Sequence, residues 1–497
     1  MNNLHGRIPP SCEFSRSAWF RAGLVLAALA LPPLLWSALC TAASSGVPWN
    51  AARLAPSFAL AYGLPVYALR DSGQQLGWFY GPGFPVWNLP ATLTSNPTHA
   101  LLIAGGWNVL TWLMPVALLL HAAGVARGWL TLAGAAFAGV LLLGNLVTNY
   151  GFYFIHVDAL CLAAGLVACA ALHRAVTQEN ERWLPVAAAA LAGAFWTKQI
   201  SCLLALAMLI WLWREGQRRL LGRLVFWCVV CTAFLSVMVF LYFGTEELLF
   251  NGWLVHSRTP WRGGAGLLLE ELARLITSSW VWLPLAGLVV WLRRASSAQD
   301  LPAATASLVR LLIWAAIIQL PLGLMAVLKA GGGLNSLHSV HYLLVALLIL
   351  AFHTFAQPRP ARPASWLAPG LWWLVAVVAP LGNAVVFSLN PGSHWNVPHS
   401  HEHLVDLARQ HPGRYYFPWN PLVTLMAEHR IQPLDDALYC LWLARLEPPV
   451  EKIRSVVPAD PVILYEEPAQ SHFALRYFPT AKSLEAGPDQ SQVRAKP

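Results

Sequence analysis

Residues 222–243 read GRLVFWCVVCTAFLSVMVFLYF and contain a single charged side chain, Arg223. An α-helix needs about 20 apolar residues to cross the hydrocarbon core of a bilayer. This stretch is therefore predicted to be a transmembrane helix. Apolar runs of similar length recur along the chain, so the fold is expected to be a bundle of membrane-spanning helices.

The composition agrees with such a bundle. The chain has 497 residues, of which 57% are hydrophobic and 11% are charged, against roughly 25% charged in a soluble protein. These values exclude a disordered chain and a disulfide-rich secreted scaffold. We predict a polytopic α-helical membrane protein with about 11 spans, at 19–42, 99–122, 128–148, 155–172, 183–197, 199–213, 222–243, 277–292, 309–328, 337–356 and 366–388.

The fifth and sixth spans are short and meet at Thr197, Lys198 and Gln199, where a single bent helix is the alternative. The first span follows basic residues, like a signal peptide, but its length favours an uncleaved anchor. The net charge of +9 is spread over short segments between the spans, so it does not indicate nucleic-acid binding. With a cytoplasmic N-terminus, 15 basic residues lie on the cytoplasmic side and 7 on the outer side up to the last span. By the positive-inside rule, this bias predicts an outer C-terminus.

The composition changes near residue 390. Residues 390–497 carry 12 of the 23 acidic residues, which indicates a soluble segment on the outer side. We therefore divide the chain into a membrane domain at 1–390, an outer α/β tail at 391–485 and a final segment at 486–497 that is predicted to be disordered. In the tail, helices are predicted at 401–410, 420–429 and 434–446, and short strands at 414–417 and 462–465.

Two outer loops are long, at 43–98 and 244–276. A packed helix bundle does not need loops of this length, and long loops are often functional. Both loops and the tail lie on the same predicted side of the membrane. The sequence therefore predicts a site at the outer membrane face.

Two acids are candidates for chemistry at that face. Asp71 is the only acid of the first outer loop, and Asp158 lies at the outer mouth of the fourth span, two residues after His156. An acid in a membrane segment is costly and usually functional. The alternatives are a solvated loop residue for Asp71 and a favourable interaction with the helix dipole for Asp158.

Four cations lie at outer helix ends or in the second long loop: Lys198, Arg258, Arg262 and Lys329. Lys329 begins the glycine-rich stretch that runs to Asn335 and Ser336. A cation beside exposed backbone N–H groups suits a phosphate. The alternative for a lysine in such a turn is a side chain that extends to the membrane interface.

Several segments resemble those of one family. The chain resembles the integral-membrane glycosyltransferases of the GT-C superfamily, near the bacterial protein mannosyltransferase-like and aminoarabinose transferase-like groups. The resemblance covers about residues 19–390. It depends on Gly63-x-Pro65-x-Tyr67 with Tyr80-Gly81-Pro82, on His156–Leu160, on Gly193–Gln199 and on Lys329–Asn335.

This resemblance implies a fold, a location and a reaction. The protein would be a multi-pass protein of the bacterial inner (plasma) membrane, with the outer tail that many members of the family have. A sugar would pass from a polyprenyl-phosphate donor to a lipid, glycan or protein acceptor at the outer face. Membrane lipids would surround the protein, and nucleic acid would not be a partner. Some relatives use a divalent metal, and the resemblance leaves a metal open here.

The resemblance also implies roles for individual residues. The family commonly carries its catalytic base as an acid soon after the first span, but this chain has Asn50 there. Asp71 is then expected to be the base, and Asp158 a second acid that acts as base or metal ligand. Lys198, Arg258, Arg262 and Lys329 are expected to bind the donor phosphate. The expected substrate-lining residues are Tyr67, Tyr80, His156 and Asn335.

Two other classes of protein remain as alternatives. The first is a lipid or sugar transporter or flippase, although the long loops lie on one side and no inverted repeat is evident. The second is a non-catalytic assembly factor of the cell envelope that kept the GT-C-like fold. The amide at Asn50, in place of the expected acid, keeps this second alternative open.

The predicted topology can be tested with reporter fusions. A periplasmic reporter fused after Pro391 should be active, and one fused at Gln357 should be inactive, because the charge bias places these points on opposite sides of the membrane. The enzymatic activity of each fusion in intact cells is the measurement. The reverse pattern would move every outer loop to the cytoplasmic side.

Overall fold

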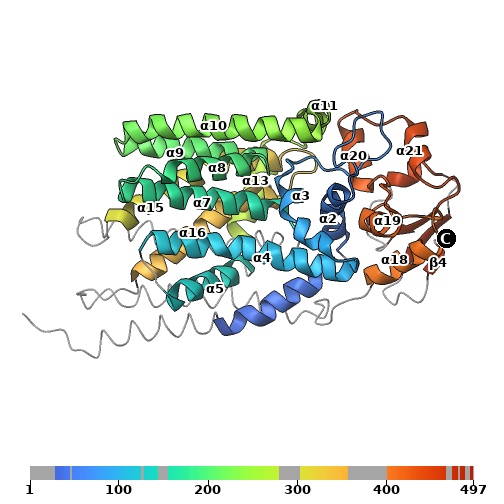
Figure 1. Cartoon of the computed structure of the whole chain (residues 1–497), viewed down its shortest axis with the longest axis horizontal. Coiled ribbons are helices and arrows are strands. Elements are labelled where there is room, and N and C mark those ends of the chain that lie inside the picture. The colour runs from blue at the N-terminus through green and yellow to red at the C-terminus, as the bar shows by residue number, and fades with distance from the viewer. Residues whose placement is uncertain are drawn as a thin grey trace, which may run out of the picture.

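The bundle is built from apolar helices that run along the long axis of the molecule (Figure 1). The computed structural model describes residues 28–44, 47–124, 128–143, 155–278, 303–355, 400–465, 473–479, 482–486 and 493–495. Within these ranges, 4 helices are long and apolar enough to cross a membrane: α4 (Pro97–Ala122), α7 (Val157–Thr177), α10 (Arg218–Phe243) and α15 (Ala303–Val327).

Shorter apolar helices complete the described part of the bundle. They are Ala28–Ala42, α5 (Trp129–Leu143), α8 (Trp183–Phe195), α9 (Cys202–Arg214) and α16 (His338–Phe355). The fifth and sixth predicted spans are thus two helices, α8 and α9, joined by a turn that contains η2 (Gln199–Ser201). The spans predicted at 277–292 and 366–388 lie outside the described residues.

Helix α7 lies at the centre of the bundle and packs against α4, α8, α15 and α16. Its sequence is rich in alanine and contains one glycine, and such small residues let neighbouring helices approach closely. At Gly165, an added Cβ would lie 2.6 Å from the Leu204 side chain of α9. Helix α10, in contrast, lies at an edge of the bundle (Figure 1) and exposes large apolar side chains such as Phe234 and Leu241, as a lipid-facing helix does.

The first outer loop is folded and lies between the bundle and the tail (Figure 1). It contains α2 (Pro48–Ala61), α3 (Gly83–Trp87) and η1 (Leu89–Leu93). Its glycines bring it against the turn after α8, where the Gly81 N–H donates to the Thr197 carbonyl at 3.2 Å and the Gly83 N–H donates to the Trp196 carbonyl at 3.0 Å.

The second outer loop contains α11 (Thr245–Leu249), the π-helical turn η3 (Phe250–Leu254), α12 (Val255–Arg258) and α13 (Ala265–Ser278). Trp261 forms an antiparallel bridge with Lys329, in the turn between α15 and η4 (Leu334–Leu337). The Arg262 N–H donates to the Leu328 carbonyl at 2.7 Å. These bonds join two outer connections that are far apart in the sequence.

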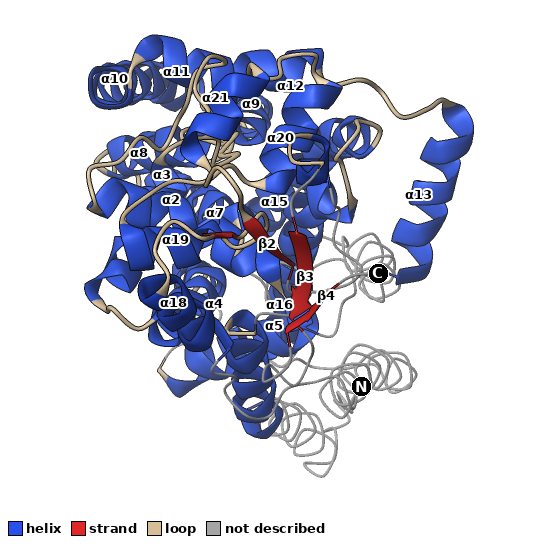
Figure 2. Ribbon diagram, turned by 90° about the vertical axis from the view of Figure 1, so that its right-hand side faces the viewer, coloured by secondary structure: helices blue, strands red, loops and turns tan. Residues whose placement is uncertain are grey.

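The tail is a small α/β unit at one end of the bundle, with its strands on the face seen in Figure 2. Its sheet has the order β1-β2-β3-β4, with parallel pairing up to β3 and antiparallel pairing of β3 with β4. Strand β4 lies within the last twelve residues, which were predicted to be disordered; pairing with β3 supplies its backbone with hydrogen bonds. The tail elements are α18 (Ser400–Gln410), β1 (Tyr415–Tyr416), α19 (Pro421–Glu428), α20 (Asp435–Leu443), α21 (Val450–Val456), β2 (Val462–Tyr465), η6 (Phe473–Arg476), β3 (Lys482–Ala486) and β4 (Val493–Ala495).

The tail packs closely against the first outer loop and α2. Helix α19 packs against α2, and the Leu434 N–H, just before α20, donates to the Gln75 carbonyl at 2.8 Å. At Gly77, an added Cβ would lie 2.7 Å from the Ala437 Cβ of α20. The absence of a side chain at Gly77 therefore allows this close approach.

Replacing Gly81 should separate the first outer loop from the bundle. A Cβ at Gly81 would overlap the Trp196 carbonyl oxygen, which is backbone and cannot rotate away. We expect Gly81→Ala to destabilise the protein by about 1–3 kcal/mol, as overpacking typically does. Gly193→Ala, on α8, is the control: no atom lies within 4 Å of the added Cβ. Thermal melting of the two detergent-solubilised variants is the measurement, and equal melting temperatures would contradict this docking.

Candidate active site

The candidate site is built around Asp158, in the first turn of α7. His156 caps this helix, because its Nδ1 accepts a hydrogen bond from the Asp158 N–H at 3.2 Å. The Asp158 residue is only 3% exposed. A buried carboxylate needs charged or hydrogen-bonding partners, since burial without them is costly.

Lys198 supplies the opposite charge. It lies in the turn between α8 and η2, and its Nζ donates to Asp158 Oδ1 at 2.5 Å. The same ammonium lies 5.7 Å from the centre of the Tyr80 ring, from the first outer loop. The structure therefore joins Asp158 and Lys198 as a largely buried ion pair, with Tyr80 beside it.

His338, the first residue of α16, binds the other carboxylate oxygen. Its Nδ1 lies 2.8 Å from Asp158 Oδ2, so a protonated Nδ1 donates to the carboxylate. Asn335 lies one turn earlier, with its Nδ2 3.4 Å from His156 Nε2. The sequence analysis missed His338, because a lone histidine at the start of an apolar run is typical of a core residue; its closeness to Asn335 was the only signal.

Three of these residues offer ligand atoms to a metal. The ligand atoms of His156, Asp158 and His338 lie within 4.8 Å of one another, and two imidazoles with a carboxylate suit a divalent transition metal. Each residue is already engaged by protein groups: His156 Nδ1 by the Asp158 N–H, and Asp158 by Lys198 and His338. A metal would therefore have to replace some of these bonds.

Asn50 and Arg53 of α2 hold the segment just before α7. The Asn50 Oδ1 accepts from the Ile155 N–H at 2.8 Å, while its Nδ2 donates to the Ala42 carbonyl at 3.1 Å. Arg53 donates to the Ile155 carbonyl at 3.3 Å. The amide that stands where the resembled family carries an acid thus connects the first apolar helix to the start of α7.

Of the other predicted residues, the two tyrosines meet near this group. The Tyr67 hydroxyl donates to the Tyr80 carbonyl at 2.8 Å. Asp71, in contrast, is exposed, and no hydrogen bond or ion pair joins it to Asp158 among the described residues. The neighbouring Arg70 donates to the Glu447 carbonyl of the tail at 3.2 Å.

The other predicted phosphate ligands lie where the second loop meets the turn after α15. Lys329 donates to the His256 carbonyl at 2.5 Å and lies 5.2 Å from the centre of the Trp261 ring. Arg262 donates from its guanidinium to the Gly332 carbonyl at 3.4 Å, and Arg258, at the end of α12, is exposed. Lys329 and Arg262 therefore join the second loop to the turn after α15.

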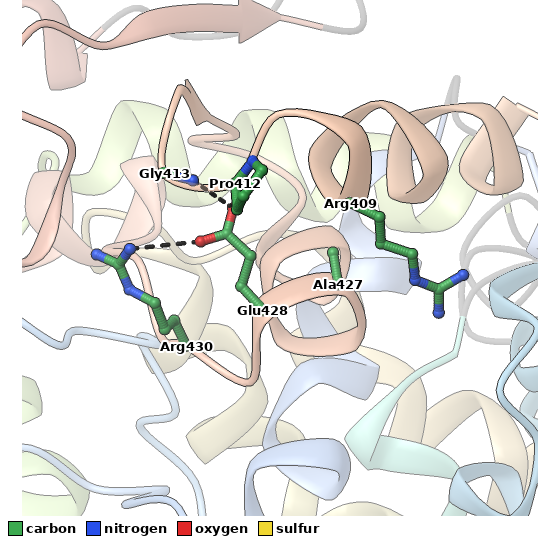
Figure 3. Close-up of a pocket in the computed structure, with 6 residues that line it drawn as sticks. All are labelled: Arg409, Pro412, Gly413, Ala427, Glu428 and Arg430. Atoms are coloured by element: carbon green, nitrogen blue, oxygen red, sulfur yellow. Dashed lines mark hydrogen bonds and ion pairs between the residues drawn. The ribbon is translucent and has the colours of Figure 1, made fainter.

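A surface pocket of about 450 Å³ lies elsewhere, in the tail between the C-terminal ends of α18 and α19 (Figure 3). Its acid, Glu428, is engaged, since it accepts from the Gly413 N–H at 3.2 Å and lies 3.3 Å from Arg430 (Figure 3). Its lining residues are Arg409, Pro412, Gly413, Ala427, Glu428 and Arg430. The pocket contains none of the residues around Asp158.

Comparisons with known proteins give one family and one fold. The family described as dolichyl-phosphate-mannose-protein mannosyltransferase matches residues 104–243. The crystal structure of ArnT from Cupriavidus metallidurans bound to undecaprenyl phosphate has 15% sequence identity and a TM-score of 0.53, covering 95% of this chain and 94% of that one. The apo structure of the same protein has 17% identity and a TM-score of 0.46, covering 88% and 81%. No curated protein sequence matches the chain.

The fold and the site define a polytopic membrane protein with a buried charged group beneath a folded outer loop and tail. The family match lies across α4 to α10, which include Asp158 and Lys198. Residues 104–243 are thus similar to the mannosyltransferase family, and the chain as a whole shares the fold of ArnT.

Removing Lys198 should destabilise the protein. Lys198→Met leaves the buried Asp158 carboxylate without its opposite charge, and breaking a buried pair from one side typically costs about 3–5 kcal/mol. The double variant with Asp158→Asn should recover much of this loss, because no charge then remains buried. Thermal melting in detergent is the measurement, with Lys452→Met on the exposed surface of α21 as control. A Lys198→Met variant that melts like wild type would contradict the pairing.

Proposed function

We propose that this protein transfers a sugar from a polyprenyl-phosphate donor to an acceptor at the outer face of the bacterial inner membrane. The main support is the Asp158–Lys198 pair, buried at the outer end of α7 and covered by the first outer loop. Undecaprenyl phosphate bound to ArnT, whose fold this chain shares, supports a lipid-phosphate partner. The charge bias of the loops supports a cytoplasmic N-terminus and an outer tail.

The reaction would be a substitution at the anomeric carbon of the sugar. A base removes the proton from the acceptor hydroxyl, the oxygen attacks the anomeric carbon, and the bond to the phosphate oxygen breaks. Polyprenyl phosphate leaves with the bonding electron pair, and nearby cations stabilise its growing negative charge. Lys198, Arg258, Arg262 and Lys329 are the cations proposed for this role.

Other residues would line the sugar and the acceptor. Tyr67, Tyr80, His156 and Asn335 are proposed here, because Tyr80 and His156 lie next to the Asp158 group and Tyr67 and Asn335 bond to them. Asp71 and Asp158 are the candidates for the general base that the sequence indicates. A divalent metal at His156, Asp158 and His338 would provide a further positive charge for the leaving phosphate.

A non-catalytic assembly factor is the second candidate function. The observation that favours it is the structural use of Asn50, which joins two backbone groups at the position of the expected acid. Such a protein would bind the lipid donor without transferring its sugar. A measurement of sugar transfer therefore distinguishes the two functions, because only the enzyme would turn over its donor.

The direct test is turnover of defined donors by the purified protein. We expect wild type, given a polyprenyl-phosphate sugar and a membrane extract as acceptor source, to release polyprenyl phosphate, detected by mass spectrometry. Binding of the donor without release would support the assembly factor. Transport of the intact donor across proteoliposomes without release would support a flippase.

Lys329 gives a sharper test of donor binding. Hydrogen bonds to charged groups contribute about 1.5–3 kcal/mol, so Lys329→Ala should weaken binding of the lipid-phosphate donor about tenfold or more. Binding of a sugar without phosphate should change less. Lys452→Ala, which removes an exposed lysine of the tail, is the matched control. Equal donor affinity of Lys329→Ala and wild type, measured by titration, would exclude Lys329 as a phosphate ligand.

A further inference from the structure

Most acids near the candidate site already have strong partners. Asp158 binds Lys198 through one oxygen and His338 through the other, and a carboxylate paired with an ammonium is a weak base. In the tail, the buried Asp435 accepts from the backbone N–H groups of Phe473 and Ala474. The next residue, Asp436, is half-buried, and among the residues that the structure describes its hydrogen-bond donor is the Cys440 thiol, at 3.9 Å.

Asp436 is held where the tail meets the outer loop. The preceding Leu434 N–H donates to the Gln75 carbonyl, and the following Ala437 packs against Gly77. Ala52 of α2 belongs to the same apolar cluster as Leu434 and Ala437. The first turn of α20 is thus fixed between the first outer loop and α2, and Asp436 is fixed with it.

The charges around Asp436 connect it to the candidate site. Asp436 interacts electrostatically with Arg53, the next residue after Ala52 on α2. The Tyr80 phenol interacts with both of these groups and also with Asp158 and Lys198. Tyr80 lies beside Lys198, and α20 packs against the same first outer loop and against α12 of the second loop. The acid of the tail and the ion pair of the bundle therefore both border the first outer loop.

We infer that Asp436 is the general base of the proposed transfer, supplied by the outer tail. This inference depends on the proposed function. The Asp436 carboxylate would take the proton from the acceptor hydroxyl as its oxygen bonds to the anomeric carbon and polyprenyl phosphate leaves. An acceptor that enters from the aqueous side would meet the tail first, whereas the proposed cations would bind the phosphate of the lipid donor.

The acid–base properties of Asp436 suit this role. Burial raises the pKa of its carboxyl to about 6, while Arg53 and the Cys440 thiol act in the opposite direction. The other titratable or charged groups on elements packed against α20 include Tyr80 of the first loop, His256 and Arg258 of α12, and Arg476 of η6. A base with a pKa near 6 is ionised at neutral pH but remains a stronger base than an ordinary aspartate.

The test compares pH profiles of turnover for wild type and Asp436→Asn. The asparagine keeps the size of the side chain but cannot take up the proton. Turnover should fall by about 10²–10⁴-fold, the usual contribution of a general base. In wild type, kcat/KM should decline below about pH 6 as the carboxylate becomes protonated. In Asp436→Asn this decline should be absent from the remaining activity, and Asp436→Glu should recover part of the turnover.

Two controls separate catalysis from structure. Asp436→Asn should melt no lower than wild type, because it removes a charge that burial disfavours. Asp460→Asn changes an exposed acid of the same tail and should leave turnover unchanged. If wild type is active and Asp436→Asn keeps more than half of its turnover, the assignment of Asp436 as the base is wrong. The assignment is also wrong if Asp71→Asn abolishes turnover while Asp436→Asn does not. Either result would leave the proposed function standing. Absence of turnover in wild type with every donor would overturn the proposed function as well.

Discussion

The buried carboxylate of Asp158 is the constraint on which the outer half of this protein depends. A charge at the end of a membrane helix must be neutralised and hydrogen-bonded, because water is scarce there. Lys198 and His338 satisfy it, and they come from the turn after α8 and from the start of α16. One side chain of α7 therefore fixes how three parts of the bundle meet at their outer ends.

The first outer loop helps to fix the segment that leads into α7 and Asp158. Asn50 donates to one backbone group and accepts from another, which an ionised carboxylate could not do because it has no hydrogen to donate. The asparagine thus makes α2 part of the support of α7. The same loop also contacts the tail: Gly77 packs against Ala437, and the Gln75 carbonyl accepts a hydrogen bond from the Leu434 N–H. The loop is a rigid layer between membrane domain and tail.

Features that depend on a local sequence pattern could be predicted, because neighbouring residues alone define them. The polar pair His156 and Asp158 stands out at the start of an apolar run, and Lys198 stands out between two short ones. The amphipathic patterns near 401–410, 420–429 and 434–446 coincide with α18, α19 and α20, since one apolar face of each helix packs inside the tail.

Other features depend on contacts between distant segments. The contact of His338 with Asp158 joins positions far apart in the sequence, and no local pattern separates it from an ordinary core histidine. The place of Asp436 follows from how α20 packs on the first outer loop, and that packing is set by tertiary contacts. Exposure separates Asp71 from Asp158, although the sequence made both of them candidate acids at the predicted outer face.

The position of α20 between α2 and the first outer loop has a consequence for biogenesis. Helix α2 is made early in synthesis, whereas α20 belongs to the last part of the chain. The early loop therefore cannot acquire its final packing until the tail has been made and has folded against it. The contact between α2, the first outer loop and α20 is thus completed late in the synthesis of the chain.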